Sequence, residues 1–313
     1  MRPTILFIPV LALLWSPLFV AAANSRVASF LQWFFPSPRT STTRAQTVDS
    51  FDVFGTIPHD TLAFTQGLTF DPENSDIIYE STGMYTQSSV RILDINTGEV
   101  LKLKKTPNNI FGEGLAFYKT AANEKRLIHI TWKSQQGFIF DATTLDVVQT
   151  FQFTTQRNEG WGITYNPHTD QFIVTDGSEY LHFWDASTLQ ETKRIPVMLQ
   201  PASSSTPAPS STNDCGDEET VEAEAEAEAV TNLNEIEWDD QTQTILANVW
   251  QTDMIVRIDP ASGSVITQYD LSDLYTCREP MADVLNGIAI SPNRDLWVTG
   301  KRWPHMYKIK FNE

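Results

Sequence analysis

Five copies of a four-residue pattern divide most of the 313-residue chain into units of similar length. The copies are Gly67-Leu68-Thr69-Phe70, Gly114-Leu115-Ala116-Phe117, Gly162-Ile163-Thr164-Tyr165, Glu235-Ile236-Glu237-Trp238 and Gly287-Ile288-Ala289-Ile290. Alternating apolar residues in each copy predict a short β-strand. Successive copies are 47, 48, 73 and 52 residues apart, and the longest interval falls to 44 without a 29-residue insertion. Intervals of this size are typical of β-propeller blades.

Each unit continues with runs of residues that predict further strands. Second strands are expected at residues 77–79, 127–130, 172–174, 245–247 and 296–298. Third strands are expected at residues 90–94, 138–141, 181–185, 255–259 and 307–311. Fourth strands are expected at residues 100–103, 147–153, 192–197 and 265–269, whereas the fifth unit ends without one.

The strand that the fifth unit lacks has a candidate at the other end of the body. Residues 51–57 precede the first unit and have no other predicted partner. An N-terminal strand that completes the last blade closes a ring and leaves only short, protected sheet edges. The sequence therefore predicts an all-β fold, a five-bladed β-propeller domain over residues 51–313. An all-β sandwich or a pair of packed sheets is the alternative, because strand spacing alone does not distinguish them.

Charge and cysteine content exclude several classes of protein. The chain has 22 Lys and Arg against 39 Asp and Glu, a net charge of −17, which argues against nucleic acid as a partner. Residues 201–229 form a low-complexity insertion with eight acidic and no basic residues, and we expect it to be disordered. Cys215 lies in this insertion, which argues against a disulfide to Cys277. Neither cysteine has the spacing of a structural zinc site.

The N-terminal segment has the composition of a targeting sequence. Arg2 precedes an apolar run that ends in Ala21-Ala22-Ala23, so residues 1–23 are predicted to be a signal peptide. A short signal-anchor in the endomembrane system is the alternative. Either interpretation places the rest of the chain in a secretory or organellar lumen, or outside the cell. If residues 1–23 are removed as a signal peptide, no stable membrane span is expected in the mature chain. Residues 24–50 show no periodicity and are expected to be a flexible leader.

The residue before each repeated pattern is expected to lie at one mouth of the central channel. These five residues are Gln66, Glu113, Trp161, Asn234 and Asn286. A purely structural ring would favour Val, Ala or Ser at such positions. Three amides, a carboxylate and an indole in one concavity instead indicate a small-molecule site.

A second ring is expected just past the second strand of each unit. Its members are Ser81, Trp132, Asp176, Trp250 and Lys301. The two tryptophans, with Trp161, would form an aromatic wall. The alternative is that they only pack the blades, as we expect of three other tryptophans, Trp184, Trp238 and Trp297. Lys301 could contact a substrate, or could pair with Asp176 or Glu113.

Nine short strings, in order along the whole body, resemble those of the plant and bacterial type of glutaminyl-peptide cyclotransferase. They are FTQGL (64–68), FGEGLAF (111–117), TW (131–132), GWGITY (160–165), TDGS (175–178), LNEIEW (233–238), ANVW (247–250), DVLNGIA (283–289) and VTGKRWP (298–304). Together they are specific, although GEGL or TDGS alone would mean little. The resemblance implies a five-bladed propeller that converts the N-terminal glutamine of a peptide to pyroglutamate and releases ammonia.

The resemblance also implies roles for individual residues. By this resemblance, Glu113 is the acid/base residue. The polar partners of the substrate are Asn234, Gln66 and Lys301. The pocket wall consists of the indoles of Trp132, Trp161 and Trp250. Asn286, from the channel ring, is expected to bind substrate as well. The leader and the insertion depart from the family pattern without interrupting any motif. No cofactor is expected to be needed for catalysis, no structural divalent cation is predicted, and the chain is expected to be a monomer.

The expected chemistry suits these residue types. Burial beside indoles disfavours the charged carboxylate, so we expect a raised pKa for Glu113, which then both accepts and donates protons. An indole N–H is a candidate donor to the substrate amide oxygen. One alternative is a metal-dependent propeller lactonase or related hydrolase, with oxygen ligands from Asn234, Asn286, Glu113 and Asp176. The other is a non-enzymatic propeller that binds peptides.

Overall fold

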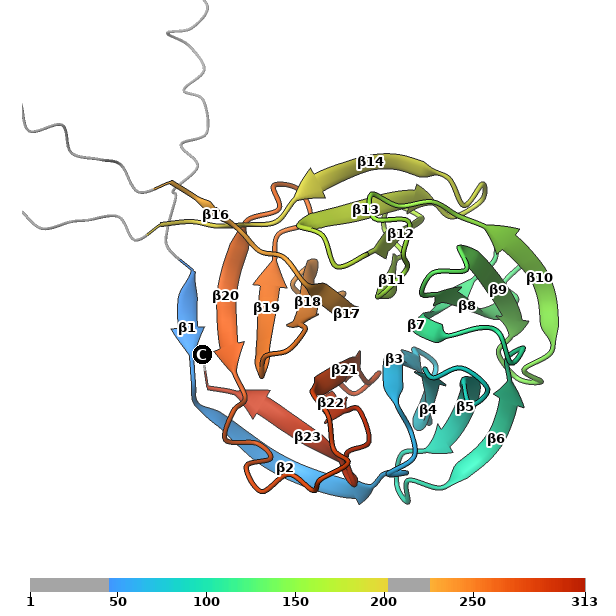
Figure 1. Ribbon diagram of the computed structural model, residues 1–313, viewed down its shortest axis with the longest axis horizontal. Coiled ribbons are helices and arrows are strands. Elements are labelled where there is room, and N and C mark those ends of the chain that lie inside the picture. The colour runs from blue at the N-terminus through green and yellow to red at the C-terminus, as the bar shows by residue number, and fades with distance from the viewer. Residues whose placement is uncertain (1–44, 202–225, 313) are drawn as a thin grey trace, which may run out of the picture. The chain divides into compact units, whose positions relative to one another are not determined.

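The five repeated patterns lie in, or begin one residue before, the innermost strands of a wheel of sheets (Figure 1). The computed structural model describes residues 45–201 and 226–312. In chain order the inner strands are β3 (Thr65–Asp71), β7 (Gly112–Lys119), β11 (Ile163–Asn166), β17 (Leu233–Asp239) and β21 (Leu285–Ile290). Each inner strand contacts the next one along the chain, and β21 contacts β3. The ring is therefore closed.

Every inner strand pairs with a second strand of its own blade, and the blade then continues outward through antiparallel neighbours. Blade 1 adds β4 (Asn74–Thr82), β5 (Ser89–Asp94) and β6 (Val100–Lys105), and blade 2 adds β8 (Lys125–Thr131), β9 (Gln136–Asp141) and β10 (Val147–Gln152). Blade 3 adds β12 (Gln171–Val174), β13 (Tyr180–Asp185) and β14 (Glu191–Pro196), and blade 4 adds β18 (Thr244–Val249), β19 (Met254–Ile258) and β20 (Val265–Asp270). Blade 5 adds β22 (Leu296–Gly300) and β23 (His305–Phe311).

The N-terminal strand completes blade 5, as the sequence predicts. Strand β2 (Phe51–Pro58) pairs antiparallel with β23, from Phe51 opposite Phe311 to Pro58 opposite His305. The all-β, five-bladed propeller is thereby confirmed, and the sandwich alternative is excluded.

The leader and the insertion differ from expectation where they meet the propeller. Strand β1 (Gln46–Val48) pairs in parallel with β20, although the leader was expected to have no regular structure. Ala45 and Val48 are buried against blade 4, which gives this short segment a reason to be ordered. At the insertion, β15 (Met198–Leu199) pairs with β16 (Glu228–Ala229). The predicted signal peptide, the rest of the leader and residues 202–225 lie outside the described residues.

The hydrophobic core consists of five clusters, each between two adjacent blades. One example joins Phe172 and Trp184 of blade 3 to Ile128 of blade 2. The tryptophans expected to pack blades do so: Trp184, Trp238 and Trp297 are all buried in such clusters. Because each blade is buried between its neighbours, the inner strands β3 and β17 are buried along their whole length. The outer strand β6, with the sequence VLKLKK, is exposed and carries lysines, which discourage edge-to-edge pairing.

The inner strands approach one another closely around the axis. A Cβ atom at Gly162 would lie 2.1 Å from the backbone oxygen of Asn234, so only glycine fits there. The fourth repeat has Glu235 at the equivalent position. Its carboxylate accepts hydrogen bonds from the backbone N–H groups of Leu68 (3.3 Å) and Ile288 (2.8 Å), on two other blades. Glu235 therefore fills the axis and ties three blades together.

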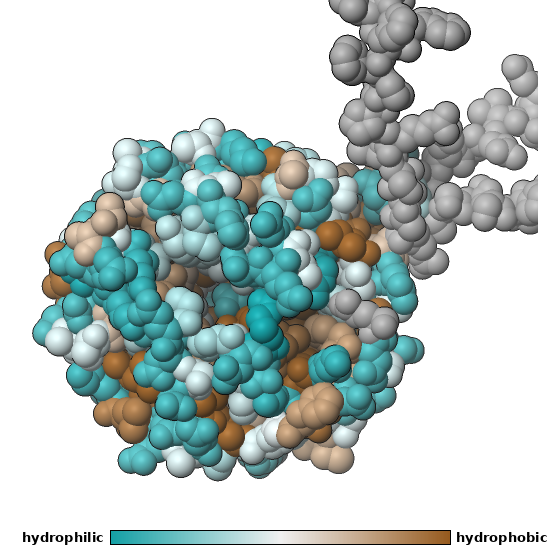
Figure 2. All heavy atoms as spheres, turned by 180° about the vertical axis from the view of Figure 1, so that it is seen from behind, coloured by the Kyte–Doolittle hydropathy of each residue, from teal (hydrophilic) through white to brown (hydrophobic). Residues whose placement is uncertain are grey.

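The face opposite to the view of Figure 1 is hollowed near its centre and is largely polar (Figure 2). A cavity of about 530 Å³ at one end of the channel is lined by Phe70, Phe117, Tyr165, Glu237, Trp238 and Arg294 among others. These residues lie in the second half of the inner strands or, for Arg294, in the turn after β21, so this cavity is at the opposite end from the predicted site residues. Among the described residues, no helix is long and apolar enough to cross a membrane.

Candidate active site

Four of the predicted channel residues occupy the same position in their strands. Gln66, Glu113, Asn234 and Asn286 are each the second residue of an inner strand, in β3, β7, β17 and β21. Since the inner strands contact one another in a ring, these residues gather at one mouth of the channel. All four are at most 4% exposed. The fifth residue, Trp161, lies two residues before β11, and its backbone oxygen accepts a hydrogen bond from Gly114 N (2.7 Å), beside Glu113.

The amide side chains leave two acceptors free for a ligand. Asn286 Nδ2 donates to Gln66 Oε1 (3.1 Å) and to the backbone oxygen of Thr65 (3.0 Å). The side-chain oxygens of Asn286 and Asn234 are buried without a hydrogen-bond partner among the described residues. Buried polar atoms are almost always satisfied, so these two oxygens are well suited to accept N–H groups of a bound molecule.

Glu113 and Lys301 form the charged part of the site. Burial raises the pKa of the Glu113 carboxyl well above its usual value, the positive charge of Lys301 opposes that rise, and the negative charge of Glu159 adds to it. Burial also lowers the pKa of Lys301, against the influence of Glu113 and Asp283. The charges of Lys301 and Glu113 therefore influence each other, but burial has the larger effect on both pKa values. The carboxyl is therefore protonated over a wider pH range than an exposed glutamate.

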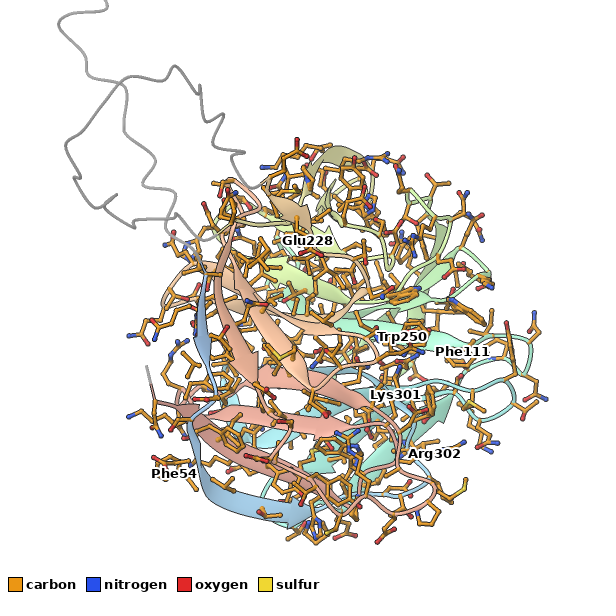
Figure 3. All side chains as sticks on the ribbon, turned by 60° about the vertical axis from the view of Figure 1, so that its left-hand side comes forward. Phe54, Phe111, Glu228, Trp250, Lys301 and Arg302 are labelled. Atoms are coloured by element: carbon orange, nitrogen blue, oxygen red, sulfur yellow. The ribbon has the colours of Figure 1, made fainter. Side chains whose placement is uncertain are left out.

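An aromatic wall surrounds this charged pair. The three predicted tryptophans belong to it, and two phenylalanines extend it. Its contacts, by distance between ring centroids, are Trp161–Trp250 at 5.5 Å, Trp132–Phe111 at 5.5 Å and Phe111–Phe64 at 6.0 Å. Lys301 Nζ lies 5.0 Å from the centre of the Phe64 ring and so joins the wall to the charged pair. Phe111, Trp250 and Lys301 come from three blades and lie on one side of the wheel, away from Phe54 on β2 (Figure 3).

Glu159 is the site residue that the sequence analysis missed. One of its oxygens, Oε2, accepts the indole N–H of Trp132 (2.7 Å) and that of Trp161 (2.9 Å). Both of these indole donors are therefore occupied in this structure, and the expectation that an indole N–H binds the substrate amide oxygen stays a prediction. A repeat signal exists for Glu159, because Phe64, Phe111 and Glu159 each stand two residues before a member of the channel ring.

One glycine makes room for the wall. Gly177 has a φ of +77°, and a Cβ atom there would lie 2.6 Å from Cζ2 of Trp161. Gly177 of the TDGS string thus provides both a left-handed backbone turn and the space in which the Trp161 indole packs.

Two members of the predicted second ring support the site without facing it. Asp176 accepts hydrogen bonds from the backbone N–H of Arg157 (2.7 Å) and from Ser178, and lies 3.3 Å from Nε2 of His182. Ser81 Oγ donates to the backbone oxygen of Glu113 (2.5 Å). Asp176 is therefore engaged with its own blade. In residues 45–201 and 226–312, no three His, Cys, Asp or Glu side chains are grouped as a metal site requires.

A family model, a curated relative and a solved structure all indicate the same family. The sequence model of the glutamine cyclotransferase family matches residues 26–206 and 208–311. A glutaminyl-peptide cyclotransferase of Arabidopsis thaliana is 32% identical over 271 residues, which cover 85% of this chain and 72% of the plant protein. The crystal structure of Myxococcus xanthus glutaminyl cyclase matches with a TM-score of 0.65 and 26% identity, over 86% of this chain and 98% of the bacterial one. The chain therefore belongs to the glutamine cyclotransferase family.

Proposed function

We propose that the pocket around Glu113 is the active site at which this glutaminyl-peptide cyclotransferase closes an N-terminal glutamine to pyroglutamate, with Glu113 as the proton shuttle. The activity follows from the family of the chain. The role of Glu113 is supported by one observation above all, a buried carboxyl of raised pKa beside Lys301 at the mouth of the channel.

The reaction joins two groups of one residue. The α-amino nitrogen attacks the side-chain amide carbon, the new C–N bond closes a five-membered ring, and the bond to the amide nitrogen breaks. One proton moves from the attacking nitrogen to the departing one, which leaves as ammonia. Because an α-amino group has a pKa of about 7.7–8.0, a neutral fraction exists near neutral pH without a strong base. Positioning and proton transfer are therefore the main tasks of the site.

A protonated Glu113 can perform the transfer without a change in its own net charge. Its hydroxyl oxygen gives a proton to the departing nitrogen, and its carbonyl oxygen accepts one from the attacking nitrogen. A carboxylate would have to accept a proton first and give it up in a second step, so the raised pKa of Glu113 is what lets one group accept and donate together. Lys301 supplies positive charge for the oxygen of the tetrahedral intermediate.

The remaining residues hold the substrate. The free oxygens of Asn234 and Asn286 accept N–H groups of the glutamine, while Gln66, whose Oε1 is taken by Asn286, offers its amide N–H groups. The wall of Trp132, Trp161 and Trp250 packs on the two methylenes and limits access of water.

The setting of the enzyme is part of the proposal. The substrates are peptides or proteins with N-terminal glutamine, and the net charge of −17 speaks against nucleic acid. The apolar run and small residues of residues 1–23 support a secretory location, lumenal or extracellular. Each step assigned above uses side chains of a single chain, in keeping with a monomer that needs no cofactor for catalysis.

Incubation with a glutamine-initiated peptide, with and without EDTA, tests the metal-independent shuttle. The expected result is loss of one ammonia from the peptide mass at the same rate in both samples. Loss of activity in EDTA, restored by a divalent cation, would instead favour the metal-dependent alternative. Peptide binding without ammonia release would favour the binding propeller.

A further inference from the structure

The carboxylate of Glu159 lies between two members of the aromatic wall. Its Oε2 atom accepts both indole N–H groups, from Trp132 on the loop after β8 and from Trp161 just before β11. These residues belong to blades 2 and 3, so a single carboxylate oxygen fixes the two rings relative to each other across a blade boundary. Hydrogen bonds to a charged acceptor are shorter and stronger than neutral ones, which makes this a firm link.

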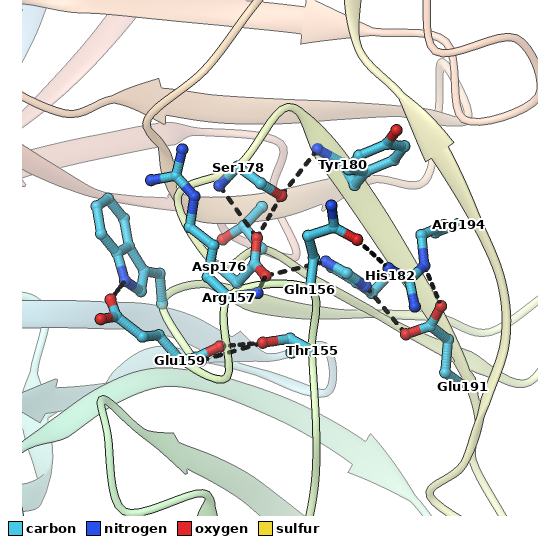
Figure 4. A network of polar contacts seen from close by, with 12 residues as sticks. Thr155, Gln156, Arg157, Glu159, Asp176, Ser178, Tyr180, His182, Glu191 and Arg194 are labelled. Atoms are coloured by element: carbon cyan, nitrogen blue, oxygen red, sulfur yellow. Dashed lines mark hydrogen bonds and ion pairs between the residues drawn. The ribbon is translucent and has the colours of Figure 1, made fainter.

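The loop that carries Glu159 is itself anchored. Thr155 Oγ1 accepts the backbone N–H of Glu159 (3.1 Å) and donates to its backbone oxygen (2.7 Å), as Figure 4 shows. Two residues earlier, the backbone N–H of Arg157 donates to Oδ2 of the fully buried Asp176. Gly160 N donates to the backbone oxygen of Trp132 (2.9 Å). These hydrogen bonds hold the loop, and with it the Glu159 carboxylate, in a fixed position.

The side chain of Glu159 remains near solvent and near other charges. It is 20% exposed, and its second oxygen, Oε1, lies 3.5 Å from Nζ of Lys133. Its negative charge also reaches Glu113. Within the described part of the chain, the charged groups that act on Glu113 are Lys301, from the loop after β22, and Glu159, from the loop before β11.

We propose that Glu159 is a positioning residue of the active site, whose carboxylate fixes the Trp132 and Trp161 indoles relative to each other. Its negative charge also acts on Glu113, in the direction that keeps the Glu113 carboxyl protonated. Glu159 touches no reacting atom in the mechanism above. The proposal rests on the proposed role of Glu113, but the effect of Glu159 on the orientation of the two indoles can be measured by tryptophan emission whether or not Glu113 has that role.

Two substitutions separate orientation from charge. Glu159→Gln keeps an acceptor oxygen for the indoles and removes the negative charge, so Glu113 should lose its proton at lower pH. The alkaline limb of the kcat/KM profile then shifts to lower pH, with the emission of the buried tryptophans little changed. Glu159→Ala removes both contributions. A misplacement of about 1 Å in an active site can cost about 10²-fold, so we expect a loss of this size in kcat/KM and a changed tryptophan emission spectrum.

Glu73→Gln is the control for the removal of one carboxylate charge. Its carboxylate pairs with Lys119 and Lys125 and follows β3 at the end away from Gln66, so it lies at the far end of the channel from the site. It should leave the pH profile and the emission spectrum as in the unmodified protein.

The outcomes separate this proposal from that for Glu113. A Glu159→Gln variant with an unshifted alkaline limb, or a Glu159→Ala variant with unchanged emission and unchanged kcat/KM, would overturn the role of Glu159. Failure of the Glu113 proposal would appear instead as full activity of Glu113→Gln. Thermal unfolding checks that both Glu159 variants are folded. If Glu159→Ala does not fold, the pH profile of Glu159→Gln decides the outcome.

Discussion

At the scale of single residues, the protonation state of Glu113 depends on the balance between its burial and two charges, those of Glu159 and Lys301. Burial favours neutral Glu113, Glu159 acts in the same direction, and Lys301 acts against both. The sequence places Glu113 in the ring of inner-strand residues and Lys301 in the ring that follows the second strands, but it gives neither the depth of burial nor the separation of the two charges. The sign of the net effect could therefore not be predicted from the residues alone.

Replacing Lys301 by methionine tests this balance. Without the cation, the pKa of Glu113 should rise further, so the alkaline limb of the kcat/KM profile should move to higher pH, opposite to the shift expected for Glu159→Gln. The value of kcat should also fall, by about 10²-fold or more, if Lys301 stabilises the oxyanion. Lys308→Met, which removes an ion-paired lysine on β23, is the control and should leave both unchanged. A limb that moves to lower pH in Lys301→Met would contradict the account.

At the scale of strands and loops, the site depends on loops that meet the aromatic wall. Gly177 is the clearest case, because its left-handed backbone and its contact with the Trp161 ring both exclude a side chain. Gly98 has almost the same φ, +76°, and a still tighter contact, because a Cβ atom there would lie 2.0 Å from the backbone oxygen of Pro58. It lies between β5 and β6, away from the indoles.

The pair of substitutions Gly177→Ala and Gly98→Ala should separate strain from function. Each forces alanine into a strained conformation, so each should lower the free energy of unfolding by more than about 1 kcal/mol. Only Gly177→Ala should also displace Trp161 and raise KM. Urea unfolding and steady-state kinetics measure the two effects. Equal KM values in the two variants would show that the position of Trp161 does not matter to binding.

The sequence predicted elements well where a pattern repeats and poorly where contacts come from outside the repeat. The five inner strands and the closing strand β2 were found because each has the same place in its unit. The strand Gln46–Val48 was not, since three residues carry no period and gain order only by packing on β20. Glu159 was missed because its role depends on a loop conformation that brings it between two indoles.

At the scale of the whole molecule, buried carboxyls occupy the axis of the wheel. Glu235 and Glu237 both have raised pKa values, with burial as the main cause, and the pKa of Glu237 rises to about 8. Glu235 accepts hydrogen bonds from the backbone N–H groups of Leu68 and Ile288, and Glu237 accepts one from the backbone N–H of Ile290. All three donors belong to other blades. Burial therefore favours the neutral form of both carboxyls near the axis, and the pKa of Glu237, at about 8, lies above neutral pH.

These axial groups make stability depend on pH. A carboxyl whose pKa is raised by folding binds a proton more tightly in the folded state, so its contribution is complete below about 4.5 and is lost as pH rises through about 8 for Glu237. Unfolding free energy should therefore fall from mildly acidic to mildly alkaline pH, by at most about 1.4 kcal/mol per pH unit for one group. Glu237→Gln should make this decline shallower in urea titrations. An equal or steeper decline in the variant would contradict a neutral Glu237 in the folded protein.

The turnover of Glu113→Gln on a glutamine-initiated peptide, followed as ammonia release, tests the central claim most directly. The substitution keeps the size of the side chain and removes the acid, so we predict a loss of about 10²–10⁴-fold in kcat with an unchanged thermal unfolding profile. Turnover equal to that of the unmodified enzyme would show that the proton passes through another group and would contradict the assignment of Glu113.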